Sequence, residues 1–203
     1  MNKPRKFEGD KLVVATHNPN KLKELENYLA PLGIALVSAA DMKVEEPEET
    51  EDSFIGNAVL KASHAAKATD MVCLADDSGL SVEALDGAPG IYSARWAEDE
   101  DGNRDWQYAM ATIENKLEGK SNRRARFVCA IALCWPDGHT ETVEGYVDGT
   151  VVWPPRGSGS FGYDPIFEPN NKRVTFGEML PEEKKAISHR SDAIHQIMEK
   201  CFR

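Results

Sequence analysis

Apolar residues along this chain alternate between short continuous runs and segments with helical spacing. Leu12–Ala15 form a short apolar run, and leucines then recur every three or four residues from Asn20 until Pro31 and Gly33 end the pattern. A second apolar run covers residues 34–37. Short runs are typical of buried strands, and the recurring leucines predict an amphipathic helix. The start of the chain therefore predicts the βαβ unit of an α/β fold.

The same alternation continues to the end of the chain. The expected helices cover residues 53–69, 105–117 and two segments within 180–202. The expected strands cover residues 71–75, 124–135, 140–147 and 149–153. The sequence PDGH at 136–139 predicts a hairpin turn between two of these strands. Since a hairpin pairs antiparallel strands, we expect a single α/β domain over residues 1–203, with a mixed central sheet flanked by helices.

Composition narrows the class of function. The formal net charge of −10 argues against nucleic-acid binding, which requires clustered Lys and Arg. No apolar run approaches the ~20 residues that span a bilayer. The basic N-terminus lacks the apolar core of a signal peptide, so we expect a cytoplasmic protein with no nucleic-acid or membrane partner. The four cysteines include no CxxC pair, which favours buried free thiols.

Two loops in the first half of the chain carry groups suited to phosphate and metal chemistry. THNPNK, Thr16–Lys21, lies between an expected strand and a helix N-terminus, where free N–H groups favour an anion. Phosphate binding is one interpretation, and a capped helix start with a surface lysine is the other. The acidic run Glu45–Thr50 is either solvated or supplies one or two ligands to a divalent cation.

The sequence ADDSGL places two acids directly after an apolar run. We expect the strand to end at Ala75 and the residues from Asp76 to Gly79 to form a turn. At such a strand end Asp77 is able to ligate Mg²⁺ or to act as a general base, and Asp76 is able to brace the turn. A turn without chemistry is the alternative.

Two later segments combine glycines, aromatics and cations. In the loop Gly157–Pro169, glycines permit close approach of a ligand, and an aromatic ring there is able to stack on a planar base. The alternative is a glycine-rich turn with core aromatics. The segment KKAISHR adds Lys184, His189 and Arg190. Arginine donates well to a purine carbonyl oxygen, whereas a lone histidine is more often structural.

Taken in series, these motifs closely resemble the inosine triphosphate pyrophosphatase family, the non-canonical purine NTP pyrophosphatases. The resemblance runs from Thr16 to Arg190 through DDSGL, GAPGIYSAR, FGYDPIF and SHR. It implies Mg²⁺-dependent hydrolysis of ITP, dITP and XTP to the monophosphate and pyrophosphate. It also implies a homodimer and a mixed α/β fold with two lobes around a deep substrate cleft.

The resemblance assigns roles by position. The triphosphate contacts would be Thr16, His17, Asn18, Pro19, Asn20 and Lys21. The Mg²⁺ carboxylates would be Glu48 and Asp77, with Glu49 a close alternative to Glu48, and Asp77 would also accept the proton. Further substrate contacts would be Ser78, Phe161, Gly162, Tyr163, Asp164, Lys184, His189 and Arg190. Among these, Phe161 would stack on the base, and His189 and Arg190 would lie near the purine 6-position.

Two positions depart from the family pattern. Gly56 stands before Asn57 where the family carries an acid, and Glu51 follows EET where a glycine is expected. Neither departure touches Asp77 or Lys21, so activity is still expected.

Three rival classes compete with this interpretation. A Maf-like pyrophosphatase is disfavoured by FGYDPIF with SHR, and a silent nucleotide-binding protein by the intact acids and lysines. The signature helix of Nudix hydrolases is missing from the sequence.

Overall fold

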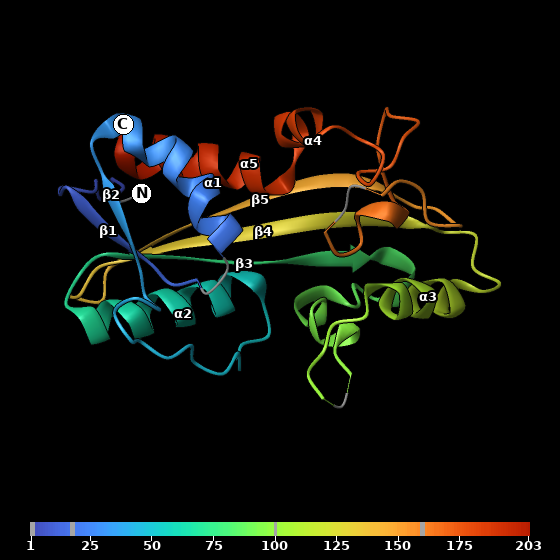
Figure 1. The fold of residues 1–203 in the computed structure, drawn as a ribbon, viewed down its shortest axis with the longest axis horizontal. Helices are drawn as coiled ribbons and strands as arrows, with labels where there is room; N and C mark the ends of the chain where they lie inside the picture. The colour runs from blue at the N-terminus through green and yellow to red at the C-terminus, as the bar shows by residue number, and fades with distance from the viewer. Residues whose placement is uncertain (1–2, 17–18, 100, 159–160) are drawn as a thin grey trace. The chain divides into compact units, whose positions relative to one another are not determined.

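The computed structural model describes residues 3–16, 19–99, 101–158 and 161–203, with only the backbone at Pro19, Asn20 and Glu24. One six-stranded sheet has the order β2-β1-β3-β4-β5-β6 (Figure 1). Its strands are β1 Lys11–Val14, β2 Ala35–Ser38, β3 Cys73–Val82, β4 Arg124–Cys134, β5 Thr140–Val151 and β6 Phe167–Pro169. The α-helices are α1 Pro19–Leu29, α2 Phe54–Thr69, α3 Trp106–Leu117, α4 Pro181–Ile187 and α5 His189–Ile197, which continues as a π-helix over Met198–Phe202.

The sheet is mixed, as the sequence predicts. Strand β1 pairs in parallel with β2, with Leu12 opposite Leu36, and in parallel with β3. Strand β6 pairs antiparallel with β5. The expected hairpin strands β4 and β5 are neighbours in the sheet. The α/β fold with a mixed, helix-flanked sheet is therefore confirmed.

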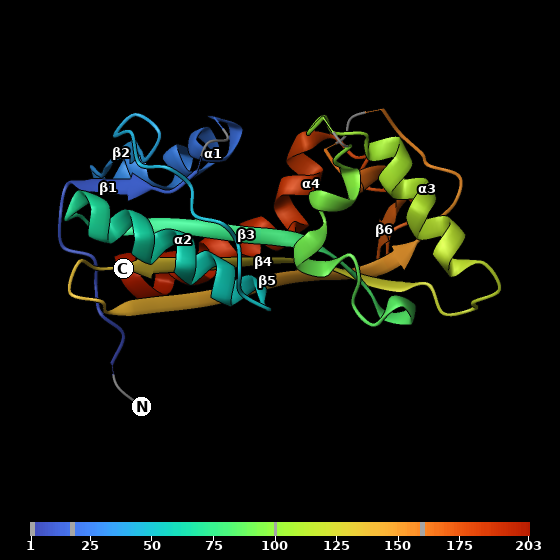
Figure 2. The same ribbon diagram turned by 90° about the horizontal axis from the view of Figure 1, so that it is seen from below.

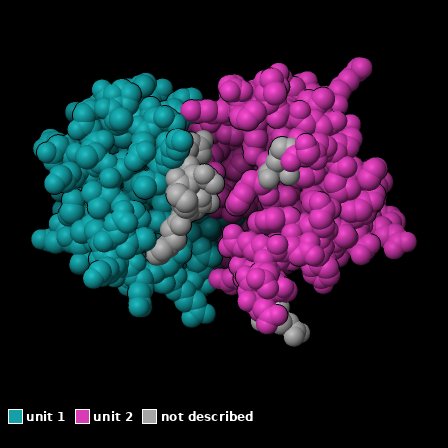
Figure 3. All heavy atoms as spheres, viewed as in Figure 1, with its two compact units in different colours: residues 1–77, 129–145, 193–203 teal, residues 78–128, 146–192 magenta. Residues whose placement is uncertain are grey.

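The chain divides into two compact units. Unit 1 comprises residues 1–77, 129–145 and 193–203, and unit 2 comprises residues 78–128 and 146–192 (Figure 3). Strands β3, β4 and β5 each contribute residues to both units. Each unit has its own hydrophobic core. The single domain and the substrate cleft expected from the sequence stay predictions.

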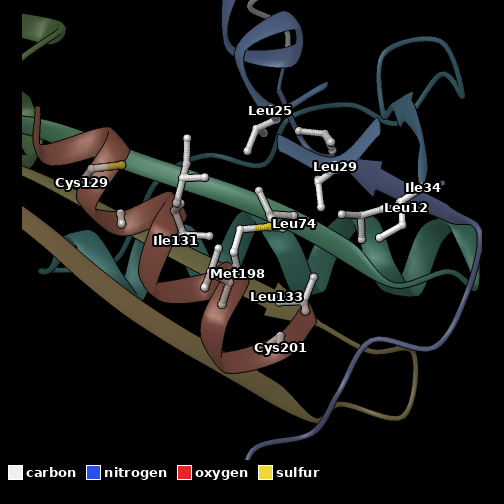
Figure 4. Packing of buried hydrophobic residues seen from close by; sticks show 14 of the residues in the cluster. Leu12, Leu25, Leu29, Ile34, Leu74, Cys129, Ile131, Leu133, Met198 and Cys201 are labelled. Atoms are coloured by element: carbon white, nitrogen blue, oxygen red, sulfur yellow. The ribbon is translucent and has the colours of Figure 1, made fainter. Parts of the chain in front are cut away.

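In unit 1 helices cover both faces of the sheet, because successive side chains of a strand point to opposite sides. Helix α1 and the C-terminal helical residues pack on one face, where Leu74, Leu25 and Met198 belong to one hydrophobic cluster (Figure 1, Figure 4). Helix α2 packs on the other face, on which the intervening Cys73 and Ala75 lie (Figure 2).

The α2 interface is made of small side chains. Helix α2 contributes Ala58, Ala62, Ala65 and Ala66, and the strands contribute Val13, Cys73, Ala75, Ala130, Ala132 and Cys134. All four cysteines are buried free thiols, as expected from the sequence. Small side chains on both partners allow the helix backbone to approach the sheet closely. Any side chain that α2 extends toward the sheet therefore reaches the strand residues directly.

Unit 2 has a core rich in aromatic rings. Phe127 of β4 packs against Phe167 of β6 and against Phe176, with ring centroids 4.7 and 5.9 Å apart. Helix α3 adds Met110 and Ile113 to the same core. This core fixes the loop that precedes β6, which carries the candidate base-binding residues.

Two sequence expectations about strands are wrong. Strand β3 does not end at Ala75 but continues through the two acids and Ser78 to Val82, so no turn forms there. Residues 149–153 do not form a separate strand, because β5 extends to Val151. Neighbouring strands in the sheet outweigh the low strand preference of aspartate and glycine.

In the described ranges, we find no helix with the length and apolar character needed to cross a membrane.

Candidate active site

The two adjacent acids of β3 point to opposite faces of the strand. Asp76 accepts a hydrogen bond from Lys21 of α1 at 2.8 Å, and both groups belong to unit 1. Asp77 lies 3.4 Å from the Nζ atom of Lys61 on α2. Alternation along the strand therefore gives each buried acid a lysine from a different helix. Pairing of this kind is what allows charged groups to remain buried.

Asp77 is the centre of a buried cluster in unit 1. The Lys61 ammonium donates to Glu49 at 2.8 Å and to Asp77 at 3.4 Å, so one cation serves two carboxylates. The side-chain amide of Asn57 donates to the second oxygen of Asp77 at 3.3 Å. The side chains of Lys61 and Asp77 are only 6% and 10% exposed. Their charges are therefore little screened by water.

The cluster shifts the pKa values of its members. Burial raises the pKa of Asp77 above its ordinary value, against the lowering effect of Lys61, and Glu49 adds to the rise. Desolvation by itself would lower the pKa of Lys61, but the surrounding acids raise it above its ordinary value. Lys61 therefore stays protonated, while Asp77 is a better proton acceptor than an ordinary aspartate.

The acidic segment, which we define as residues 45–52, brings one glutamate to this cluster. Glu49 is partly buried and contacts Lys61, whereas Glu48 is exposed to solvent. The geometry thus favours Glu49 over the predicted Glu48 as the second carboxylate beside Asp77. Among the described residues no group of three or more His, Cys, Asp or Glu is placed to hold a metal ion. A divalent cation there would have two protein carboxylates.

The predicted triphosphate loop is described only in part. Thr16 is buried after β1, and Lys21 lies in the first turn of α1, paired with Asp76. His17 and Asn18 lie outside the described residues, as do the side chains of Pro19 and Asn20. Lys21 and Asp76 thereby connect this loop with β3 inside unit 1.

The predicted base-binding residues of unit 2 form an ordered loop. Asp164 is buried and accepts hydrogen bonds from the Phe161 backbone N–H, at 3.2 Å, and from the Lys184 ammonium. The Tyr163 hydroxyl donates to the Ser93 carbonyl oxygen at 2.9 Å. Burial raises the pKa of the Tyr163 hydroxyl far above its ordinary value, so the hydroxyl stays protonated. These bonds tie Tyr163 and Asp164 to other segments of unit 2.

Phe161 itself remains 57% exposed. Its ring lies 5.7 Å from the ring of Trp106, which opens α3 and also contacts Tyr163 at 5.4 Å. Gly162 takes a positive φ of 69°, a conformation that glycine adopts without strain. The Phe161 ring is thus exposed to solvent, and Trp106 packs against it.

The SHR motif lies at the start of α5 in unit 2. The His189 ring stacks on Phe127, with centroids 4.9 Å apart and an interplanar angle of 11°. Arg190 donates to the Ser78 hydroxyl at 3.3 Å. Two predicted contacts, Ser78 and Arg190, are therefore brought together by a direct hydrogen bond.

Three residues of these sites were not found from the sequence. They are Asn57, Lys61 and Trp106. A signal for Lys61 was present, because it lies between Ala58, Ala62 and Ala65 on the apolar face of α2. A lysine on a buried face is rare unless it is paired. Asn57, one turn earlier, lies on the same face.

Strand β3 lies inside the mixed sheet and carries two buried aspartates, each paired with a lysine. The protein is therefore an α/β protein with a buried charged site on a central strand. The sequence model of the Ham1 family matches residues 12–200. The chain belongs to the Ham1 family, and the family resemblance found in the sequence is confirmed.

Individual relatives match over nearly their whole length. A dITP/XTP pyrophosphatase of Rhodospirillum centenum is 53% identical over 205 residues, covering 100% of each chain. A HAM1 protein of Coxiella burnetii is 38% identical with a TM-score of 0.88, covering 93% of this chain and 96% of the other. A nucleoside-triphosphatase / dITP/XTP pyrophosphatase of Mycobacterium abscessus is 41% identical with a TM-score of 0.77, covering 92% and 97%.

Removal of the Lys61 charge should destabilise the protein. Lys61→Met leaves Asp77 and Glu49 without their shared ammonium, and loss of one partner of a buried pair costs about 3 kcal/mol. Urea denaturation at pH 7 measures the change in the free energy of unfolding. Lys67→Met, an exposed lysine of the same helix, should change it by less than about 0.5 kcal/mol. Equal effects of the two substitutions would show that the buried pairing contributes nothing.

Proposed function

We propose that this protein hydrolyses non-canonical purine nucleoside triphosphates, namely ITP, dITP and XTP, to the monophosphate and pyrophosphate. The observation that carries this function is the buried Asp77–Lys61–Glu49 cluster on β3, in a chain of the Ham1 family. Relatives named dITP/XTP pyrophosphatase match the full length of the chain, which supports the same substrate class. The activity would remove deaminated purines from the nucleotide pool.

The donor set of the cluster fits Mg²⁺. Carboxylate oxygens are the ligands that Mg²⁺ prefers, and it usually takes one or two of them together with substrate phosphates. The carboxylates of Asp77 and Glu49 carry two negative charges, and the Lys61 ammonium offsets only one of them. The remaining negative charge favours a second cation. Asp77 and Glu49, with Glu48 as the exposed alternative, would therefore hold the ion. When bound, Mg²⁺ would offset phosphate charge and polarise the phosphoryl oxygens.

The reaction we propose is attack of water on the α-phosphorus. Asp77 orients the water and accepts its proton as a general base. The new bond joins the water oxygen to the α-phosphorus. The bond from that phosphorus to the oxygen bridging the β-phosphate breaks, and pyrophosphate leaves with that oxygen. Asn57 and Lys61 hold the Asp77 carboxylate in place during this step.

Lysines supply the remaining positive charge. A nucleoside triphosphate carries about four negative charges near neutral pH. In phosphoryl transfer, positioning and electrostatic stabilisation of these charges account for most of the rate enhancement. Lys21 in unit 1 and Lys184 in unit 2 are both paired with buried acids, Asp76 and Asp164. We assign Lys21 and Thr16 to the phosphates, together with the predicted His17–Asn20 backbone. The paired acids hold the lysines in defined positions.

The base would be recognised by unit 2. The exposed ring of Phe161 offers a stacking surface, within the loop that includes Gly162, Tyr163 and Asp164. His189 and Arg190, with Ser78, would supply hydrogen bonds to a 6-keto purine. The 6-amino group of adenine presents donors instead, and a mismatch of buried donors discriminates by orders of magnitude.

The wider setting follows from the family resemblance. We propose that residues 1–203 act as one pyrophosphatase domain with the substrate in the predicted cleft. We also propose that the protein is a homodimer, acts in the cytoplasm, and has no nucleic-acid or membrane partner. Size-exclusion chromatography with light scattering tests the dimer directly.

A substrate panel tests the proposed activity. With Mg²⁺ present, pyrophosphate release from ITP, dITP and XTP should exceed release from ATP and UTP by at least about 100-fold in kcat/KM. GTP belongs in the panel because it shares the 6-keto group and differs at the 2-position. Preference for UTP or dTTP would contradict the purine assignment. Absence of turnover with every nucleotide would instead support a silent binding protein.

The role of Asp77 is tested by removing its charge without changing its shape. Asp77→Asn should lower kcat for ITP by about 10²- to 10⁴-fold, because the amide cannot accept the proton. Circular dichroism should show an unchanged fold. Asp41→Asn, an exposed acid without an assigned role, should stay within about twofold of the native rate. Near-native turnover by Asp77→Asn would remove Asp77 from the mechanism.

The stacking role of Phe161 predicts a defect in binding. Phe161→Leu should raise KM for ITP about tenfold, because stacking of a base on an aromatic ring contributes about 1–3 kcal/mol. The value of kcat should change little, since the ring does not touch the reacting phosphate. Tyr108→Leu, which replaces another exposed aromatic of unit 2, is the matched control. Equal KM values for the two variants would rule out stacking on Phe161.

A further inference from the structure

The first turn of α2 has no room for a side chain at residue 56. A Cβ atom placed on Gly56 would lie 2.7 Å from the Cβ of Glu51 and 2.9 Å from the Oγ of Ser53. Optimal contact between carbon atoms is about 3.5–4.0 Å, so both approaches are repulsive. The structure therefore requires the absence of a side chain at this position.

The contact with Glu51 is the harder of the two to relieve, because the Ser53 oxygen is the terminal atom of its side chain and has to shift by only a few tenths of an ångström. The Cβ of Glu51 is attached directly to the backbone, so rotation of the side chain does not displace it. Ser53 is the N-cap of α2, and its hydroxyl accepts a hydrogen bond from the Gly56 N–H at 3.1 Å. Loss of an N-cap bond destabilises a helix start. A side chain at residue 56 would therefore push the acidic segment away from α2.

The contact matters because the acidic segment is tied to Asp77 through one amide. The Glu51 backbone N–H donates to Oδ1 of Asn57 at 3.1 Å. Nδ2 of the same Asn57 side chain donates to Asp77 at 3.3 Å, and Asn57 is 1% exposed. The Glu51 bond fixes which way round the amide lies, because its oxygen must face Glu51 and its nitrogen Asp77.

We infer that Glu51 and Gly56 are a size-matched pair that orients Asp77 through Asn57. The Glu51 side chain occupies the space that Gly56 leaves open and keeps the Glu51 N–H within reach of Asn57. Gly56 is thus a positioning residue that does not touch the substrate. The two departures that the resemblance implies, an acid in place of glycine at residue 51 and a glycine in place of an acid at residue 56, would then form one compensated exchange.

Helix propensity by itself predicts the opposite sign for a substitution at residue 56. Glycine is a poor helix former, so Gly→Ala within a helix ordinarily stabilises a protein. The pair predicts that Gly56→Ala is harmful, and that removal of the Glu51 side chain reverses the harm. Coupling between the two positions separates these explanations.

The experiment compares Gly56→Ala, Glu51→Gly and the double variant, each as the full chain. Hydrogen exchange at the residue 51 amide, followed by NMR, reports its bond to Asn57. Exchange should accelerate at least about tenfold in Gly56→Ala. In the double variant the exchange rate should return to within about threefold of the rate in Glu51→Gly. Glu51→Gly serves as the reference because it carries the same change in the loop.

Turnover gives a second measurement, which rests on the proposed function. In Gly56→Ala, kcat for ITP should fall about 10- to 100-fold with a smaller change in KM, because a displaced Asp77 affects the chemical step. The double variant should recover kcat to within about threefold of Glu51→Gly. If the native chain does not hydrolyse ITP, the proposed function fails, and hydrogen exchange still decides the pairing.

Several results would overturn the inference. Native exchange and turnover in Gly56→Ala would show that a side chain fits at residue 56. A double variant as impaired as Gly56→Ala would show that the positions are not coupled. Coupled exchange with unchanged kcat would refute the positioning role. If Gly56→Ala proves insoluble, a soluble double variant with a protected residue 51 amide supports the pair, and an insoluble one contradicts it.

Discussion

Strand β3 carries two consecutive aspartates through the sheet, and the alternation of its side chains sends them to opposite faces. A buried carboxylate is costly unless a cation or hydrogen-bond donors accompany it. Asp76 is matched by Lys21 from α1, and Asp77 by Lys61 and Asn57 from α2. Helices α1 and α2 thus each supply a charge to the same strand. The site depends on this double pairing, because burial of two unpaired carboxylates would strongly destabilise the fold.

The packing of α2 makes this pairing possible. Alanines on the helix face small residues on β1, β3 and β4, so the helix approaches the sheet closely. At that approach, Lys61 reaches Asp77 on the strand and Glu49 in the acidic segment. The same lysine therefore joins three segments that are separate in the sequence. The packing of α2 against the sheet therefore also determines the geometry of the site. The lack of a side chain at Gly56 allows the loop that precedes the helix to pack against it as well.

Much of the fold and part of the site could be predicted from local patterns. Hydrophobic spacing located α1, α2 and α3, and the ordered motifs identified the family. The extension of β3 past Ala75 could not be predicted, because aspartate disfavours strands and the opposing interactions come from distant segments. For the same reason, sequence spacing did not separate Glu48 from Glu49. Neighbouring residues differ in burial only once the loop packs against α2.

The division of the chain between two cores has a consequence for function. Asp77 is the last residue of its segment of unit 1, and Ser78 is the first of unit 2. The residues assigned to water activation pack with the unit 1 core, and those assigned to the base pack with the aromatic core of unit 2. Substitutions in separate cores usually have additive effects. The base contacts that we propose, Phe161, His189 and Arg190, can therefore change while the buried cluster on β3 stays unchanged.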